Sequence, residues 1–60
     1  MKRRISKIPH PEQMQIYNEY LSGLYLIKEI IKKHDITYHT FYQVIENVKL
    51  LIKEKLYEQN

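Results

Sequence analysis

The sequence contains no cysteine, which excludes several ways of stabilising a chain of 60 residues. Neither a disulfide nor a thiolate metal site can form. The three histidines are too dispersed for a zinc site, and no HExxH spacing occurs. We therefore expect no metal and no cofactor. Association with a second copy of the chain becomes the expected route to further stability for so small a scaffold.

Glycine and long apolar runs are scarce as well. The longest unbroken apolar run covers residues 24–27, too short for a membrane span or a signal-peptide core, so we expect a cytoplasmic protein without a membrane partner. A single glycine and the lack of alternating apolar runs argue against hairpins and sheets. No phosphate-binding glycine loop and no nucleophile beside a base is apparent. We therefore expect no enzymatic activity and no small-molecule substrate.

Basic residues are concentrated at the N-terminus. The first ten residues contain Lys2, Arg3, Arg4 and Lys7 without an acid, whereas residues 11–60 carry six basic and seven acidic residues. We expect residues 1–10 to form a flexible basic arm, and residues 11–60 a single helical domain. Such an arm either contacts the phosphates or the minor groove of a nucleic acid, or only keeps the chain soluble.

Apolar residues recur at helical spacing in three successive runs, which predict an all-α fold. Pro11 suits the first turn of the first helix, and Gly23 is suited to end it. We expect Thr37 to cap the last helix. The runs are Met14, Tyr17, Leu21 and Leu24; Ile27, Ile30, Ile31 and His34; and Phe41, Val44, Ile45, Val48, Leu51, Ile52 and Leu56.

Residues 27–46, IKEIIKKHDITYHTFYQVIE, resemble the bihelical core of prokaryotic helix-turn-helix proteins, especially resolvase, invertase and transposase DNA-binding domains. With the upstream helix, the resemblance covers about residues 12–47. It implies a three-helix domain with an extended C-terminal helix, and a sequence-specific protein that binds double-stranded DNA as a transcriptional regulator or a recombination accessory factor. The matching positions are Ile27, Ile30, Ile36, Thr37, Thr40, Phe41, Val44 and Ile45.

Two positions depart from the family pattern. Asp35 stands where the family has its turn glycine, and Asp is among the few residues that adopt the left-handed conformation. Ile31 replaces a small alanine, so we expect it either to push the helices apart or to turn toward a third element. His34 occupies an apolar position of the pattern and is expected at the edge of the core.

The resemblance also implies which residues contact DNA. Gln43 can bind adenine with two hydrogen bonds, and His39 can donate to guanine or to a phosphate. The alternative is that the lysines are only solvated and that the tyrosines pack in an interface. The expected groove-facing residues are Thr37, Tyr38, His39, Tyr42 and Gln43, and the expected backbone contacts are Arg3, Arg4, Lys7, Lys28, Lys32 and Lys33.

The apolar stripe of the last helix continues past the part that resembles a helix-turn-helix. Because this stripe lacks an obvious partner in the same chain, we expect it to form a homodimer interface. Two copies would then present two reading helices to successive major grooves. The expected interface residues are Val48, Leu51, Ile52 and Leu56.

A different architecture remains open from the sequence. Tyr25 is a poor cap for a second helix, so residues 11–34 could form one helix that pairs with residues 38–58. Such a hairpin would dimerise into a four-helix bundle. It would then be a protein-interaction module that regulates or inhibits a partner protein. An interruption of the helix near Gly23 would argue against this hairpin.

Overall fold

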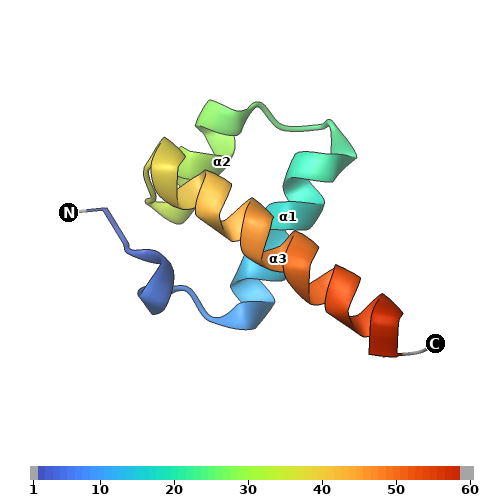
Figure 1. Cartoon of the computed structure of the whole chain (residues 1–60). Coiled ribbons are helices and arrows are strands. Elements are labelled where there is room, and N and C mark those ends of the chain that lie inside the picture. Colours follow the sequence, from blue (N-terminus) through green and yellow to red (C-terminus); the bar gives the residue numbers. More distant parts are fainter. Residues whose placement is uncertain (1, 59–60) are drawn as a thin grey trace.

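The structure is a computed structural model that describes the backbone of residues 2–58 and the side chains of residues 2–55. The described chain consists of helices joined by short loops and contains no strand, so the expected all-α fold is confirmed (Figure 1). Its elements are the 3-10 turn η1 (Ile5–Lys7) and the helices α1 (His10–Ser22), α2 (Ile27–His34) and α3 (Tyr38–Glu58).

The first helix begins and ends where local sequence signals place its ends. Pro11 lies in the first turn of α1, where its missing N–H costs no hydrogen bond. Gly23 follows the helix with a φ of 72°, a left-handed conformation that glycine adopts without a steric penalty. The chain then stays non-helical until Ile27. The continuous helix over residues 11–34, which the hairpin alternative requires, is therefore wrong.

A tight turn joins α2 to α3. Asp35 adopts the left-handed conformation with a φ of 55°, as expected from its position. The next residue, Ile36, donates its N–H to the Ile31 carbonyl and buries its side chain in the core. Thr37 then caps α3, because its Oγ1 accepts the N–H of Thr40 at 3.2 Å. The cap predicted from the sequence is thus confirmed.

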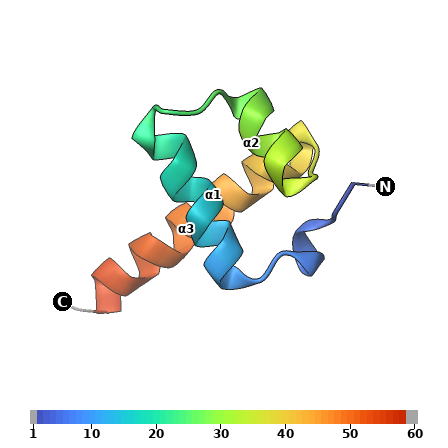
Figure 2. The ribbon, with the colours of Figure 1, turned by 180° about the vertical axis from the view of Figure 1, so that it is seen from behind.

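The core lies where α1 crosses the first half of α3, with α2 closing one side (Figures 1 and 2). Ile31, which stands where the helix-turn-helix pattern has alanine, is only partly buried and packs against this core. The fully buried hydrophobic residues are Ile8, Ile16, Ile30, Ile36, Phe41, Val44, Ile45 and Val48.

The N-terminal segment differs from the expected flexible arm. Ile8 is only 3% exposed and belongs to the core, and Ile5 packs partly against it. The Gln13 side-chain amide donates to the Ile8 carbonyl at 2.9 Å. Two isoleucines three residues apart are too few to predict a helix, but on one 3-10 turn they reach the same apolar surface. Ile5 and Ile8, which the charge pattern places in a solvent-exposed arm, therefore pack in or against the small core.

Candidate nucleic-acid interface

The first turns of α3 expose one face while the opposite face is buried. Phe41 and Val44 are completely buried, whereas Tyr38 and Tyr42 are 51% and 53% exposed. This division follows from the helical period, which separates the two sets of side chains by about half a turn. We call the exposed set, Tyr38, His39, Tyr42 and Gln43, the α3 face.

Thr37 is the remaining residue of the five that are expected to face the groove of DNA, and it has a structural role. The Thr37 hydroxyl accepts the Thr40 N–H and lies 3.2 Å from the Thr40 hydroxyl, to which it donates. Thr37 is itself exposed, but its oxygen holds the start of α3 in place. Thr37 therefore serves first as the helix cap, and any contact with a ligand would have to share that oxygen.

Tyr42 joins the α3 face to the core. Its ring meets the Phe41 ring edge-on, with centroids 5.2 Å apart and an interplanar angle of 76°. Phe41 is contacted in the same edge-on manner by Tyr20 of α1, at 5.5 Å. Edge-to-face aromatic pairs are favourable and hold ring orientations in place. The exposed Tyr42 ring is thus oriented by packing rather than free to rotate in solvent.

An open groove of about 420 Å³ runs between the N-terminal segment and the α3 face. Ile5 forms one side, and three residues of the α3 face, His39, Tyr42 and Gln43, form the other. Glu46 and Asn47 complete the lining, so the groove contains one carboxylate. The N-terminal segment, expected to be a separate arm, therefore lies beside the residues that the sequence predicts to read DNA.

Arg3 is bound within the protein. Its guanidinium donates to both oxygens of Glu12 at 2.7 Å and to the His34 carbonyl at 3.2 Å, and its backbone N–H donates to the Asp35 carbonyl at 2.9 Å. Hydrogen bonds from Arg3, and then from His34, lower the pKa of Glu12 from 4.5 to about 2. The sequence predicts a phosphate contact at Arg3. Its donors are instead used to tie the N-terminal segment to α1 and to the end of α2.

His34 lies between two carboxylates. Its Nδ1 is 2.9 Å from Glu12 Oε2 and its Nε2 is 2.8 Å from Glu19 Oε1, with a side chain only 5% exposed. Only the doubly protonated ring donates to both oxygens at once. The expected position at the edge of the core is confirmed. The contacts of His34 with these two carboxylates are not predicted from the sequence, although the seven-residue spacing of Glu12 and Glu19 places both on one face of α1.

Lys33 extends this polar cluster to the other side of α2. It forms an ion pair with Glu19 and lies over the Tyr25 ring, 5.6 Å from its centroid. Burial opposes ionisation of Glu19, but hydrogen bonds from Lys33 and His34 lower its pKa overall. Like Arg3, Lys33 is therefore engaged within the chain rather than presented freely to a ligand.

The other basic residues of the expected set remain exposed. Arg4 and Lys7 lie on the N-terminal segment, and Lys28 and Lys32 on α2; none forms an ion pair among the described residues. Several acidic side chains, by contrast, already form ion pairs or hydrogen bonds within the chain. Glu12, Glu19 and Asp35 are in ion pairs, and Glu29 accepts the Leu26 N–H that begins α2. The exposed charged side chains that remain available to attract a ligand are thus mainly basic.

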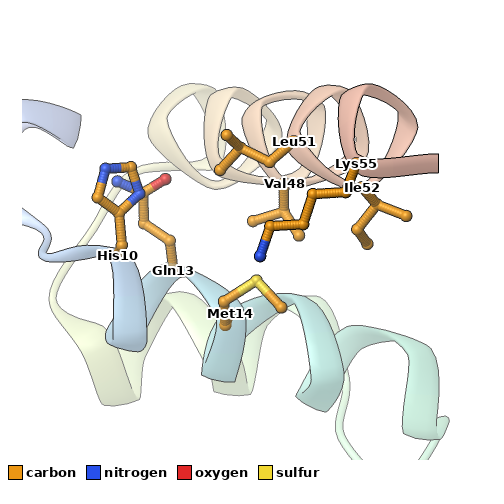
Figure 3. Close-up of a pocket in the computed structure, with 7 residues that line it drawn as sticks. All are labelled: His10, Gln13, Met14, Val48, Leu51, Ile52 and Lys55. Atoms are coloured by element: carbon orange, nitrogen blue, oxygen red, sulfur yellow. The ribbon is translucent and has the colours of Figure 1, made fainter. Parts of the chain in front are cut away.

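A second groove of about 420 Å³, apolar in character, lies between α1 and the later turns of α3 (Figure 3). Met14 of α1 faces Ile52 and the Lys55 side chain across it. Val48 is completely buried, so it is not available to another chain as the dimer interface required. Leu51 and Ile52 are each 37% exposed, while the side chain of Leu56 lies outside the described residues.

No helix among residues 2–58 is long and apolar enough to cross a membrane. Among the same residues, no group of three or more His, Asp or Glu side chains is arranged so that it could hold a metal ion. Scans against protein-family models, curated proteins and solved structures find no match for this chain.

Proposed function

We propose that this chain is a sequence-specific DNA-binding protein of the helix-turn-helix class, in which the first turns of α3 enter the major groove. The observation that carries the proposal is the division of α3. One side is buried by the core, and the other exposes four side chains capable of polar contacts, Tyr38, His39, Tyr42 and Gln43. An α-helix fits the major groove of B-DNA, where base edges can be distinguished.

The chemistry of the α3 face suits base recognition. The Gln43 amide can donate to and accept from adenine, and His39 can donate to guanine. Tyr38 and Tyr42 offer rings for thymine methyl groups and hydroxyls for phosphates. A short helix α2 and a tight turn hold these residues on a rigid support, which sharpens recognition because few rotamers must be fixed on binding.

Positive charge around the α3 face would supply affinity that does not depend on sequence. Lys28 and Lys32 are exposed on α2, and Arg4 and Lys7 are exposed on the segment whose Ile5 lines the groove beside α3. Each phosphate contact releases counterions, so binding should weaken steeply as salt rises. The absence of Lys and Arg between residues 37 and 47 leaves this electrostatic task to the flanking elements.

The direct test is selection of duplexes from a randomised pool by the full chain, followed by anisotropy titrations. We expect enrichment of a short A/T-containing motif and an affinity for it well above that for random duplex. The log of the binding constant should fall linearly with the log of salt concentration. No binding to any duplex at low salt would refute the proposed function.

We further propose that two copies associate through the apolar groove between α1 and α3. Leu51 and Ile52 continue the buried stripe of α3 and line this groove together with Gln13 and Met14 of α1 (Figure 3). Gln13 Oε1 in this groove is buried and accepts no hydrogen bond from the described residues. An unsatisfied buried acceptor costs free energy, but this atom has too little accessible surface for a donor from a second chain to reach it. A two-fold dimer would match a palindromic site.

A second candidate function, protein interaction, is favoured by one observation. The loop between α1 and α2 exposes Leu24 by 81% and Leu26 by 59%, next to the exposed Leu21 and Tyr25. Exposed apolar clusters of this kind often mark binding surfaces for another protein. If the selection experiment finds no duplex, this loop becomes the first surface to test with Leu24→Ser and Leu26→Ser.

A further inference from the structure

We infer that the N-terminal segment, residues 4–7, is a preformed phosphate-contacting element fixed beside the α3 face, and that Arg3 positions it. This inference rests on the proposed DNA-binding function. It assigns Arg4 and Lys7 to the DNA backbone and removes Arg3 from the set of DNA contacts.

The segment is held at both ends. On the N-terminal side, the Arg3 N–H binds the Asp35 carbonyl, and the Arg3 guanidinium binds Glu12 and the His34 carbonyl. On the C-terminal side, Ile8 is buried in the core and its carbonyl accepts the Gln13 amide. These contacts join the segment to α1 and to the turn between α2 and α3, so it moves with the helices rather than as a tail.

The segment also has an internal structure. The Lys7 N–H donates to the Arg4 carbonyl at 2.9 Å, the Ile8 N–H donates to the Ile5 carbonyl at 3.1 Å, and Arg3 Nη2 donates to the Lys7 carbonyl at 3.4 Å. These bonds form the single turn of η1 and close it against Arg3. The exposed Arg4 and Lys7 therefore project from a fixed backbone.

The position of η1 relative to α3 gives these two cations a target. Ile5 lines the open groove together with His39 and Gln43, so its neighbours Arg4 and Lys7 flank the helix proposed to enter the major groove. The phosphates that border a groove lie to either side of a helix within it. Glu46, which also lines the groove, repels phosphate. The contact is therefore expected on the solvent side of η1, through Arg4 and Lys7.

A preformed element binds differently from a flexible arm. A disordered arm loses conformational entropy when it binds, whereas η1 is already ordered and loses only side-chain freedom. Removing charge from η1 should consequently weaken binding more than removing equal charge from a distant part of the surface. Lys53 provides that comparison for a single charge, because it lies ten residues beyond Gln43, about 15 Å along the helix.

The experiment measures binding of the full chain to a random-sequence duplex across a range of salt concentrations. Arg4→Gln with Lys7→Gln should lower affinity roughly tenfold at low salt and reduce the salt slope by about 1.8, that is about 0.9 for each cation. Lys53→Gln should change the slope by much less than the ~0.9 expected for each of these two cations. Thermal unfolding of each variant verifies that the helices remain folded at the assay temperature.

A double-mutant cycle tests the positioning role of Arg3. Arg3→Gln keeps the charges of Arg4 and Lys7 but removes the side-chain hydrogen bonds that fix the segment. Substituting Arg4 and Lys7 in that variant should therefore lower the affinity for DNA less than it does when Arg3 is present. Additive losses would show that Arg3 does not position these cations. A slope change for Lys53→Gln equal to the change per cation in the Arg4/Lys7 variant would overturn the phosphate contact while leaving DNA binding intact. Failure of the unmodified chain to bind any duplex would instead refute the proposed function itself.

Discussion

At the scale of single residues, Gln43 carries the most specific chemistry on the α3 face. It is exposed and lines the groove beside His39, so its amide can reach a base without disturbing the core. We predict that Gln43→Ala lowers affinity for the selected duplex by about 1–3 kcal/mol and leaves binding to random duplex nearly unchanged. Anisotropy titrations against both duplexes measure the difference.

Gln15→Ala is the matched control for this prediction. Gln15 is equally polar and exposed, but it lies on α1, where its amide approaches Glu19 at 3.5 Å. It should change neither affinity. If Gln43→Ala weakens binding to both duplexes by the same factor, Gln43 supports folding or touches the backbone and does not read a base.

Glu12 gives a second prediction at this scale. Arg3 and His34 lower its pKa from 4.5 to about 2, so the carboxylate is more acidic in the folded than in the unfolded chain. Stabilisation from such a group is complete above its unfolded-state pKa and disappears as pH falls through its folded-state pKa. The free energy of unfolding should therefore decline from about pH 4.5 to about pH 2.

Glu12→Gln tests this origin of the pH dependence. The variant should be less stable at neutral pH by about 2 kcal/mol, because hydrogen bonds to a charged group are lost. Its decline below pH 4.5 should be shallower, although Glu19, whose pKa is also lowered, keeps a part of it. Glu54→Gln on the exposed side of α3 should behave like the unmodified chain in urea unfolding at each pH.

At the scale of helices and turns, the features that the sequence predicts are those set by local geometry. Gly23 ends α1 and Asp35 forms the left-handed turn because few residues tolerate a positive φ. Thr37 caps α3 because its oxygen reaches the free amide three residues later. Each of these roles depends on neighbours within four residues, which a single sequence contains.

The features that the sequence misses depend on contacts between distant residues. The N-terminal segment is basic and short of apolar residues, so composition predicts an arm, yet Arg3 finds Glu12 and Ile8 finds the core. The sequence correctly predicts which side of α3 carries the apolar stripe. Whether α1 or another chain covers a given residue is a tertiary question, and Val48 proves to lie under α1.

The cap of α3 supplies the prediction at this scale. Thr37→Ala removes the oxygen that accepts the Thr40 N–H and should lower the free energy of unfolding by about 1 kcal/mol. Thr37→Ser keeps a capping oxygen and should cost much less. Thermal unfolding of the three proteins measures both changes. Equal stability of the alanine and serine variants would mean that the hydroxyl does not hold the start of α3.

At the scale of the whole molecule, α3 extends beyond the body formed by the other helices (Figures 1 and 2). A chain of this size buries only about 60% of the surface that its unfolded form exposes, so its stability from one core is small. The exposed part of the α3 stripe and the unsatisfied Gln13 Oε1 occur in the same groove. Covering that groove with a second copy would add apolar burial.

The last prediction is that the unmodified chain sediments as a dimer at micromolar concentration and that Leu51→Gln with Ile52→Gln converts it to a monomer. Both side chains are 37% exposed in the single chain, and the last fully buried residue, Val48, is unchanged, so the helices of the variant should still form. Leu50→Gln is the control, because Leu50 is exposed on another side of α3 and should leave the dimer intact. The monomeric variant should also bind a palindromic duplex more weakly than the dimer, since it loses the second half-site. A chain that sediments as a folded monomer over the whole concentration range would refute the dimer, and recognition would then rest on one α3 face per DNA site.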